Sequence, residues 1–164
     1  MYIAGTGHRP KYCPCKYNEN HPWLAKLKSD LELRLAEIVD NHYEFSNSPI
    51  IIRTGGAIGW DTWLAQVALK MRLPLHLYLP FPGQETKWPT ESRKEYERIK
   101  SLASRVIYAS DDYYPEVFLK RDVDMITGCS KILALLNPEA DSGGTFYTVN
   151  KAKELGINVE NFWR

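Results

Sequence analysis

The sequence is short of the features that would place it in several special classes of protein. Three cysteines in 164 residues do not make a disulfide framework, and two of them lie together in Cys13-Pro14-Cys15. A reducing environment is therefore expected, and we predict a cytoplasmic protein. The formal net charge of +1 creates no overall field that would draw in nucleic acid or an anionic membrane surface.

Long apolar runs are also missing. No stretch approaches the ~20 residues that a membrane-spanning helix needs, so no membrane partner is expected. The apolar start at residues 1–4 is broken at once by Gly5, which does not fit a signal peptide. Internal repeats, low-complexity segments and Gly/Ser linkers are absent, and residues 1–164 are expected to form one domain.

What the chain does contain is an alternation of short β-like runs with longer amphipathic runs. Apolar runs predict strands at residues 2–6, 50–52, 74–79, 105–109 and 131–136, with a short final strand near 157–159. Helical spacing predicts helices at residues 23–39, 60–71, 90–102, 116–127 and 143–155. This alternation indicates a parallel sheet covered on both faces. We predict an α/β, Rossmann-like three-layer fold with a mostly parallel sheet of five or six strands and helices on both faces.

Three glycine-containing loops follow predicted strands. They are Gly5-Thr6-Gly7-His8-Arg9, Gly55-Gly56-Ala57-Ile58-Gly59 and Ser142-Gly143-Gly144-Thr145. In a parallel sheet all three fall at the carboxyl edge, where open α/β sheets bind ligands. Glycine lets the backbone approach a ligand, and a helix N-terminus offers free N–H groups to an anion. The loops together predict a phosphate site, although a single Gly-Gly pair is more often only a turn.

The familiar nucleotide motifs are not among these loops. None fits Gly-x-Gly-x-x-Gly, and no Walker loop ending in Gly-Lys-Ser/Thr is present. NAD-dependent dehydrogenases and P-loop ATPases are therefore disfavoured, and we assign no cofactor. We also assign no metal, because Cys13, Cys15 and His21, with His8 as a fourth ligand, are a weak match to the paired spacing of zinc sites.

The loops resemble the YspA/YpsA-related branch of the SLOG superfamily, in the same order and over nearly the whole chain. The similar segments are Thr6-Gly7-His8-Arg9-Pro10, Gly55 to Asp61, Leu79-Pro80-Phe81-Pro82-Gly83-Gln84-Glu85 with Trp88-Pro89, Arg121 with Met125, and Ser142 to Thr145. The superfamily includes LOG-type phosphoribohydrolases and DprA-like DNA-processing proteins. The resemblance implies a Rossmann-like fold that binds nucleotides, nucleotide-derived signals or, in DprA-like members, single-stranded DNA.

One departure bears on catalysis. LOG-type enzymes carry Pro-Gly-Gly-x-Gly-Thr-x-x-Glu with a catalytic glutamate, whereas Thr148 stands at the corresponding position here. Asp61, Glu85 or Asp122 remains as a replacement carboxylate, and we name Asp61 and Glu85 as the catalytic candidates. In the resembled branch, position 122 tends to hold asparagine.

Four residues next to the loops have both a functional and a structural interpretation. The Arg9 guanidinium suits a phosphate, or pairs with a surface carboxylate. His8 acts on a ligand, or orients the loop through a backbone hydrogen bond. Asp61 binds ribose or acts in catalysis, or stabilises the start of its helix. Arg121 is a second phosphate clamp, or forms an exposed ion pair.

The loop around Gln84 and Trp88 is predicted to lie over the site. Trp88 or Trp60 would then stack on a base, or Trp88 instead fills the edge of the core. A cluster of lysines near the first helix would contact nucleic-acid phosphates, or belongs to a solvated helix face. These lysines are Lys11, Lys16, Lys26 and Lys28.

The first functional hypothesis is a sensor or ligand-binding domain for a nucleotide or nucleotide derivative. A hydrolase that cleaves a nucleotide's glycosidic bond is the alternative, and single-stranded nucleic-acid binding is a second one. A homodimer is also reasonable, given the abundant aromatic residues. The predicted ligand-binding residues are Gly5, Thr6, Gly7, His8, Arg9, Gly55, Gly56, Ala57, Gly59, Asp61, Gln84, Trp88, Arg121, Ser142, Gly143, Gly144 and Thr145.

Overall fold

A computed structural model describes residues 1–164 and contains one six-stranded sheet. All neighbouring strands are parallel, in the order β4-β3-β2-β1-β5-β6. This confirms the predicted α/β, Rossmann-like class. The strands are β1 (Tyr2–Gly7), β2 (Ile51–Thr54), β3 (Leu75–Leu79), β4 (Arg105–Tyr108), β5 (Lys131–Leu135) and β6 (Asn158–Asn161).

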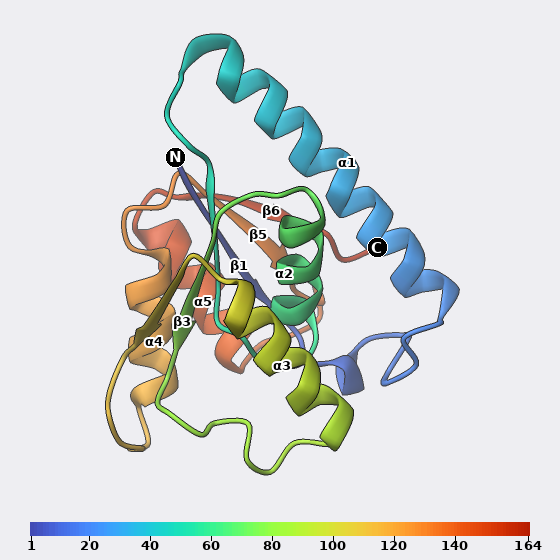
Figure 1. Ribbon diagram of the computed structural model, residues 1–164, viewed down its shortest axis with the longest axis vertical. Helices are drawn as coiled ribbons and strands as arrows, with labels where there is room; N and C mark the ends of the chain where they lie inside the picture. Colours follow the sequence, from blue (N-terminus) through green and yellow to red (C-terminus); the bar gives the residue numbers. More distant parts are fainter.

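Five α-helices and one short 3-10 helix, η1, connect the strands. They are η1 (Pro10–Tyr12), α1 (Pro22–Phe45), α2 (Trp60–Lys70), α3 (Thr90–Leu102), α4 (Val117–Ile126) and α5 (Gly144–Glu154). Helices α1, α2 and α3 pack as neighbours on one face of the sheet, and α4 packs with α5 on the other (Figure 1). These are the three layers that the sequence predicted.

The structure has helices and strands at the predicted positions, apart from the end of the first helix. Periodicity predicted that this helix ends near residue 39, whereas α1 continues to Phe45. Its last buried residue is Ile38, so the buried face ends where the predicted helix ended. The helix runs on as a solvated segment, and Ser46 is the residue that follows its last turn.

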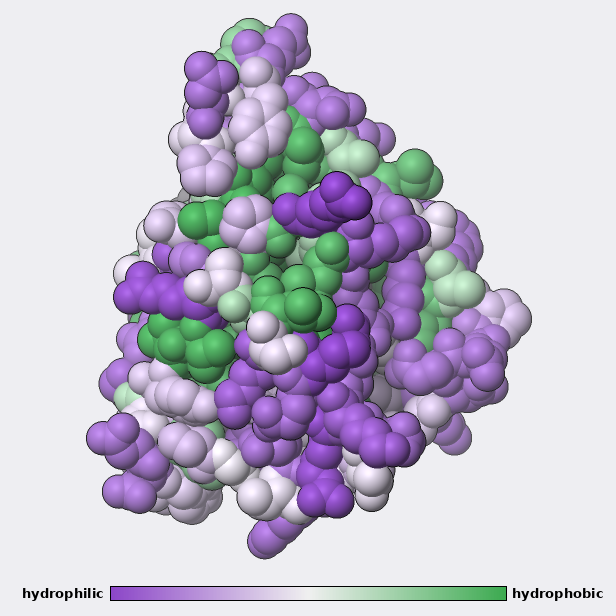
Figure 2. Space-filling model, viewed as in Figure 1, coloured by the Kyte–Doolittle hydropathy of each residue, from purple (hydrophilic) through white to green (hydrophobic).

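The main core lies between the sheet and the layer of α1 to α3. Alternate residues of β3 are buried. Helix α2 packs against β1 and β2 and contributes Trp60, Trp63 and Leu64 to this core. Figure 2 shows one face of the molecule, with hydrophilic residues over much of its rim and hydrophobic residues gathered nearer its middle. A smaller core, which includes Met125, lies under α4 and α5.

The strand order defines where a ligand site is expected. The chain builds the sheet outward from β1 through β2 and β3 to β4, and then returns across the sheet to place β5 on the other side of β1. The loops after β1 and β5 therefore leave the sheet toward opposite faces. In open α/β sheets, ligands bind in the crevice at such a topological switch point.

A buried arginine holds α4 on its face of the sheet. Arg53 points from β2 toward the end of α4, where its Nη1 donates to the backbone oxygens of Met125 at 3.2 Å and Thr127 at 2.8 Å. Its guanidinium also lies 3.8 Å from the centre of the Tyr2 ring, within reach of a cation–π attraction. Arg53 thus supplies donors for carbonyls that the end of a helix leaves unpaired.

Replacement of Arg53 is expected to destabilise the fold. Arg53→Ala leaves the carbonyls at the end of α4 without their charged donor, which should cost about 2–4 kcal/mol of unfolding free energy. Urea denaturation followed by circular dichroism measures this loss. Arg93→Ala, on the exposed face of α3, is the matched control and should change the unfolding free energy by less than about 0.5 kcal/mol. Equal stability of the two variants would contradict the role given to Arg53.

Candidate functional site

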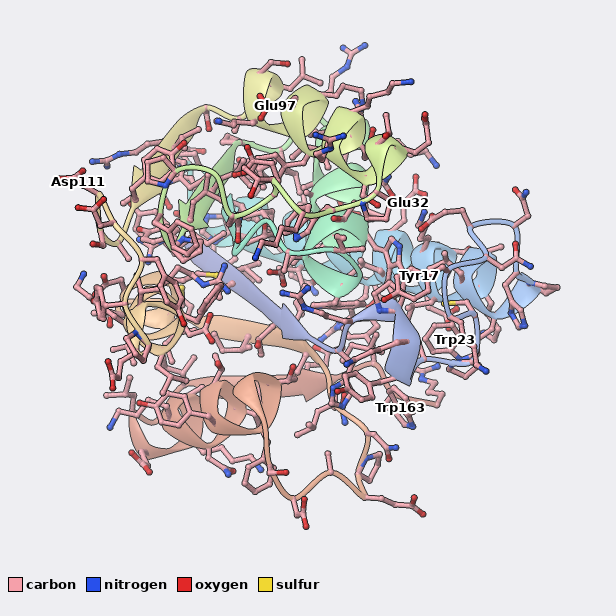
Figure 3. All side chains as sticks on the ribbon, turned by 90° about the horizontal axis from the view of Figure 1, so that it is seen from below. Tyr17, Trp23, Glu32, Glu97, Asp111 and Trp163 are labelled. Carbon is pink, nitrogen blue, oxygen red and sulfur yellow. The ribbon has the colours of Figure 1, made fainter.

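A cavity of about 600 Å³ opens at the switch point, a volume typical of small-molecule sites. The loops after β1, β2 and β5 and one face of α4 line it. Figure 3 looks at the molecule from this edge of the sheet. The predicted site residues that line the cavity are Thr6, Gly7, His8, Arg9, Ala57, Asp61, Arg121, Ser142, Gly143, Gly144 and Thr145.

The third glycine loop, Ser142 to Thr145, has free space beside its glycine Gly143. Helix α5 begins after Gly143 with no side chain capping its first N–H groups. Gly143 has a φ of +94°, and no atom lies within 4 Å of the place where its Cβ would stand. The unpaired N–H groups and the positive end of the helix dipole therefore face free space in the cavity, which is the arrangement that binds anions.

The second glycine loop is closed by protein atoms. A Cβ on Gly59 would lie 2.7 Å from the carbonyl oxygen of His8, and one on Gly55 would overlap the guanidinium of Arg121. A Cβ on Gly56 would lie 2.7 Å from the side chain of Leu79. These three glycines are outside the cavity lining, and their lack of a side chain serves the packing of the loop.

The first glycine loop serves close packing as well. A Cβ on Gly5 would overlap the Leu64 side chain, and one on Gly7 would lie 2.5 Å from Trp60. The glycines of β1 therefore let α2 approach the sheet. Gly5 lies outside the cavity lining, whereas Gly7 contributes to it.

His8 connects the first loop to the third. Its ring Nε2 accepts a hydrogen bond from the backbone N–H of Asn137 at 3.0 Å, and the backbone N–H of His8 donates to the carbonyl of Leu135 at 3.0 Å. The ring packs between Tyr12 and Trp163. Burial lowers the pKa of His8, because it disfavours the charged imidazolium. His8 therefore makes the backbone hydrogen bond of its structural interpretation, and it also lines the cavity, as its functional interpretation requires.

Arg121 and two carboxylates form the floor of the cavity. Arg121 is only 7% exposed, so the predicted alternative of an exposed ion pair is wrong. Its Nη1 donates to the carbonyls of Gly55 and Tyr78, and its Nε lies 2.7 Å from Oδ1 of Asp122. Because these partners engage much of the guanidinium, the exposed Arg9 is better placed to take a phosphate.

Asp61 is buried in the first turn of α2, where its Oδ2 accepts a hydrogen bond from the N–H of Ala57 at 3.2 Å. Burial raises the pKa of Asp61 to about 6, and the nearby charge of Arg121 opposes this rise. Asp61 thus stabilises its own loop and also presents to the cavity a carboxyl group that titrates near neutral pH.

Asp122 occupies the space beside Thr148. The hydroxyl of Thr148 lies 3.0 Å from Oδ2 of Asp122 and 2.8 Å from the carbonyl oxygen of Gly144. A carboxylate from α4 therefore lies next to the position where LOG-type enzymes carry a glutamate on the following helix. Sequence spacing alone does not reveal this relation, because residues 122 and 148 belong to different helices.

Charges in the cavity are mixed. Asp61, Asp122 and Asp141 line it together with Arg9, Lys11 and Arg121. Arg121 is paired with Asp122, whereas neither Arg9 nor Lys11 takes part in an ion pair. The Lys11 ammonium lies over the ring of Tyr12, 4.6 Å from its centre. The cavity thus offers two free cations beside the first loop and carboxylate acceptors on its floor.

The predicted lid residues lie elsewhere. Trp88 packs against Tyr96 with ring centres 5.4 Å apart, and it fills the edge of the main core. Gln84 and Glu85 also lie outside the cavity lining. Trp60 is fully buried and donates its Nε1 hydrogen to the carbonyl of Leu133, so the prediction that Trp60 stacks on a base is wrong.

In the structure, the two cysteines named from the sequence are buried, and two of the four named lysines form ion pairs. Cys13 and Cys15 are free buried thiols, and burial raises the pKa of Cys13 to about 12. His21 accepts a hydrogen bond from the N–H of Trp23 at the start of α1. Lys26 pairs with Asp30, and Lys28 pairs with Glu19, as expected of a solvated helix face.

Some lining residues were not predicted. They are Lys11, Tyr12, Phe118, Met125, Asn137, Ala140 and Asp141, and Asp122 was named only as a replacement carboxylate. Helical spacing was the available signal for α4, because Phe118, Arg121, Asp122 and Met125 recur at intervals of three and four. The remaining residues lie in η1 and in the loop after β5, where periodicity is absent.

The fold and the cavity define a Rossmann-like α/β protein with a site at its switch point, and the sequence comparison identifies its family. The family model described as the YspA SLOG family matches residues 3–160. The chain belongs to this family.

Its relatives match over most of their length. A UPF0398 protein of Bacillus cereus strain B4264 is 30% identical over 167 residues, which cover 98% of this chain and 86% of the relative. A UPF0398 protein of Bacillus thuringiensis strain Al Hakam is 29% identical with the same coverage.

Solved structures of DNA processing protein A (DprA) share the fold. The protein from Helicobacter pylori, described for its single-stranded DNA binding mode, superposes with a TM-score of 0.64 at 17% identity, over 98% of this chain and 64% of its own. The protein from Streptococcus pneumoniae gives a TM-score of 0.61 at 17% identity. This match covers 98% of our chain but only 49% of the S. pneumoniae chain.

The hydrogen bond between Asn137 and His8 predicts a pH dependence of stability. Because the folded-state pKa of His8 is lowered, its contribution is fully present above the unfolded pKa of about 6.5. It is lost as pH falls through the folded-state pKa, since an imidazolium does not accept the Asn137 N–H. Thermal melts of the wild type and His8→Gln between pH 7 and pH 5 test this prediction.

Glutamine keeps an acceptor at position 8 and does not titrate. The wild type should therefore lose more stability than His8→Gln over this range, although Asp61 and the other titrating groups are the same in both proteins. Parallel losses in the two proteins would contradict the prediction.

Proposed function

We propose that this protein binds a nucleotide or a nucleotide derivative, as a sensor or ligand-binding domain. The observation that carries the proposal is the uncapped start of α5 at Gly143 and Gly144, which opens on a cavity at the switch point of the sheet. The first N–H groups of α5 suit a phosphate. The exposed Arg9 also lines the cavity and offers a guanidinium fork to an anion.

The carboxylates of the floor favour a ligand with hydroxyl groups next to its phosphate. Asp61 and Asp122 are acceptors when ionised, and the hydroxyls of a ribose are donors that match them. A purely anionic ligand such as a polyphosphate would meet repulsion from these two groups. A sugar phosphate with one charged end therefore fits the mixed charges of the cavity.

Binding is tested by isothermal titration with adenosine, guanosine, cytidine and uridine 5′-monophosphates, NAD and ADP-ribose. We expect at least one of them to bind the wild type. Thr145→Glu places a carboxylate in the first turn of α5, where it competes with phosphate for the N–H groups, and should weaken binding about ten-fold or more. Arg9→Ala should weaken it by a similar factor.

Thr145→Gln is the matched control, because glutamine has the size of glutamate without its charge. It should bind much more tightly than Thr145→Glu. Equal affinities of these two variants would place the phosphate elsewhere, and the absence of binding by every compound would contradict the proposed function.

A second candidate function is hydrolysis of the glycosidic bond of a nucleotide. Asp61 favours it, because a buried carboxyl group whose pKa is about 6 can take up and release a proton near neutral pH. Asp122 stands beside it and stabilises positive charge on the sugar. Water would add to the sugar carbon as the bond to the base breaks, giving free base and ribose 5-phosphate.

The hydrolase candidate predicts a pH-dependent activity. Incubation with nucleoside 5′-monophosphates should release free base, and the rate should fall as pH drops below about 6, where Asp61 becomes protonated. Asp61→Asn should lower the rate by about 10²–10⁴-fold. Chromatography of the products measures the release. Bound nucleotide that stays intact at pH 7 would rule out hydrolysis and leave the binding function in place.

Other predictions from the sequence remain proposals. The structure contains no helix that is both long and apolar enough to cross a membrane. The cytoplasmic location and the homodimer stay predictions. Binding of single-stranded nucleic acid finds support in the DprA fold, but ion pairs neutralise two of the four lysines considered for it.

A further inference from the structure

An aromatic cluster stands at one end of the cavity and is not used by the phosphate site. Phe118, in the first turns of α4, lines the cavity. Its ring lies 5.9 Å from that of Phe81 in the loop after β3, and 6.5 Å from that of Tyr113 in the loop after β4. Phe81 and Tyr113 also contact each other, at 5.5 Å. The rings of Phe81 and Tyr113, which come from two different loops, thus hold the ring of Phe118 in place at the cavity.

Two of the three rings belong to the loops after β3 and β4, and these strands lie on the other side of β1 from β5, the strand that leads into α5. On α4, Phe118 is one turn before Arg121 and Asp122, about 5 Å away along the helix axis. Phe81 follows β3, which is three strands away from β5 in the sheet, and this separation is about 14 Å. The cavity lining thus combines the start of α5, carboxylates and an aromatic ring.

Of the two aromatic residues that line the cavity, Phe118 is the better partner for a base. Tyr12 lies beside the predicted phosphate ligand Arg9, and the Lys11 ammonium stands over its ring. No cation lies over the ring of Phe118, and Phe81 and Tyr113 meet it at steep angles of 78° and 63°. An edge-to-face support of this kind fixes a ring.

We propose that Phe118 is the base-stacking residue of the site, and that Phe81 and Tyr113 position its ring. This inference rests on the proposed nucleotide-binding function and adds where the base lies. The ligand class is a nucleoside 5′-phosphate with its phosphate at α5 and its base on Phe118. The stacking residue is then on α4, and the Trp88 loop, which the sequence favoured, serves the core instead.

The experiment compares nucleoside 5′-monophosphates with ribose 5-phosphate, which has the same phosphate and sugar but no base. The wild type should bind the best nucleotide about ten- to a hundred-fold more tightly than ribose 5-phosphate, as expected for one stacked base. Phe118→Leu keeps an apolar side chain against Phe81 and Tyr113 but removes the aromatic face. It should abolish this difference and leave the affinity for ribose 5-phosphate within about two-fold of the wild type.

Matched variants separate stacking from a general change in α4. Phe118→Trp should retain the preference for the nucleotide. Leu119→Ala alters the exposed neighbour on the same helix and should change neither affinity. Tyr113→Ala, at an exposed position, should lower the affinity for the nucleotide alone, because it loosens the support of Phe118. Near-ultraviolet circular dichroism and melting temperature confirm that each variant is folded.

The outcomes distinguish the two proposals. If the wild type binds neither nucleotide nor ribose 5-phosphate, the proposed function fails. If the wild type prefers the nucleotide and Phe118→Leu shows the same preference, only the stacking proposal fails. Loss of the preference in Tyr12→Ala, but not in Phe118→Leu, would move the base to the other side of the cavity and overturn the proposal.

Discussion

The site depends on the hydrogen bonds and the ion pair that the guanidinium of Arg121 forms. Its donors reach the carbonyls of Gly55 and Tyr78, and its Nε pairs with Asp122. One side chain of α4 thereby fixes that helix against the ends of β2 and β3. Position 55 has room only for glycine, because a Cβ would overlap the guanidinium. The ion pair with Arg121 also helps to hold Asp122 at the cavity.

The same buried charge governs the chemistry of the floor. Burial disfavours the ionised form of Asp61, while Arg121 favours it, and the result is a carboxyl group with a pKa of about 6. Asp122 is held between Arg121 on its own helix and Thr148 on α5. Position 148 thus contributes a hydroxyl that orients a carboxylate from elsewhere. The cavity lining therefore carries one carboxylate held by Arg121 and Thr148 and a second one with a raised pKa.

The three glycine loops look alike in sequence but differ in what their glycines do. Gly5 and Gly7 admit α2 to the sheet, Gly55 and Gly59 admit Arg121 and the backbone of the first loop, and only Gly143 faces open space. A glycine pattern records that a backbone needs room, but it does not record whether protein or ligand fills that room. For this reason the sequence overestimated the number of glycines at the cavity, while it placed all three loops at the correct edge of the sheet.

The sequence by itself determined the layers, the parallel sheet and the edge that carries the site, because periodicity and strand–helix alternation are local signals. The order of the motifs along the chain also identified the family. Only the tertiary structure decided which side chains meet there. Trp88 and Tyr96 are drawn into the core, Phe118 turns toward the cavity, and Asp122 reaches Thr148 across two helices. Contacts of this kind join residues far apart in the chain, and they depend on how α4 crosses the sheet, which no local pattern encodes.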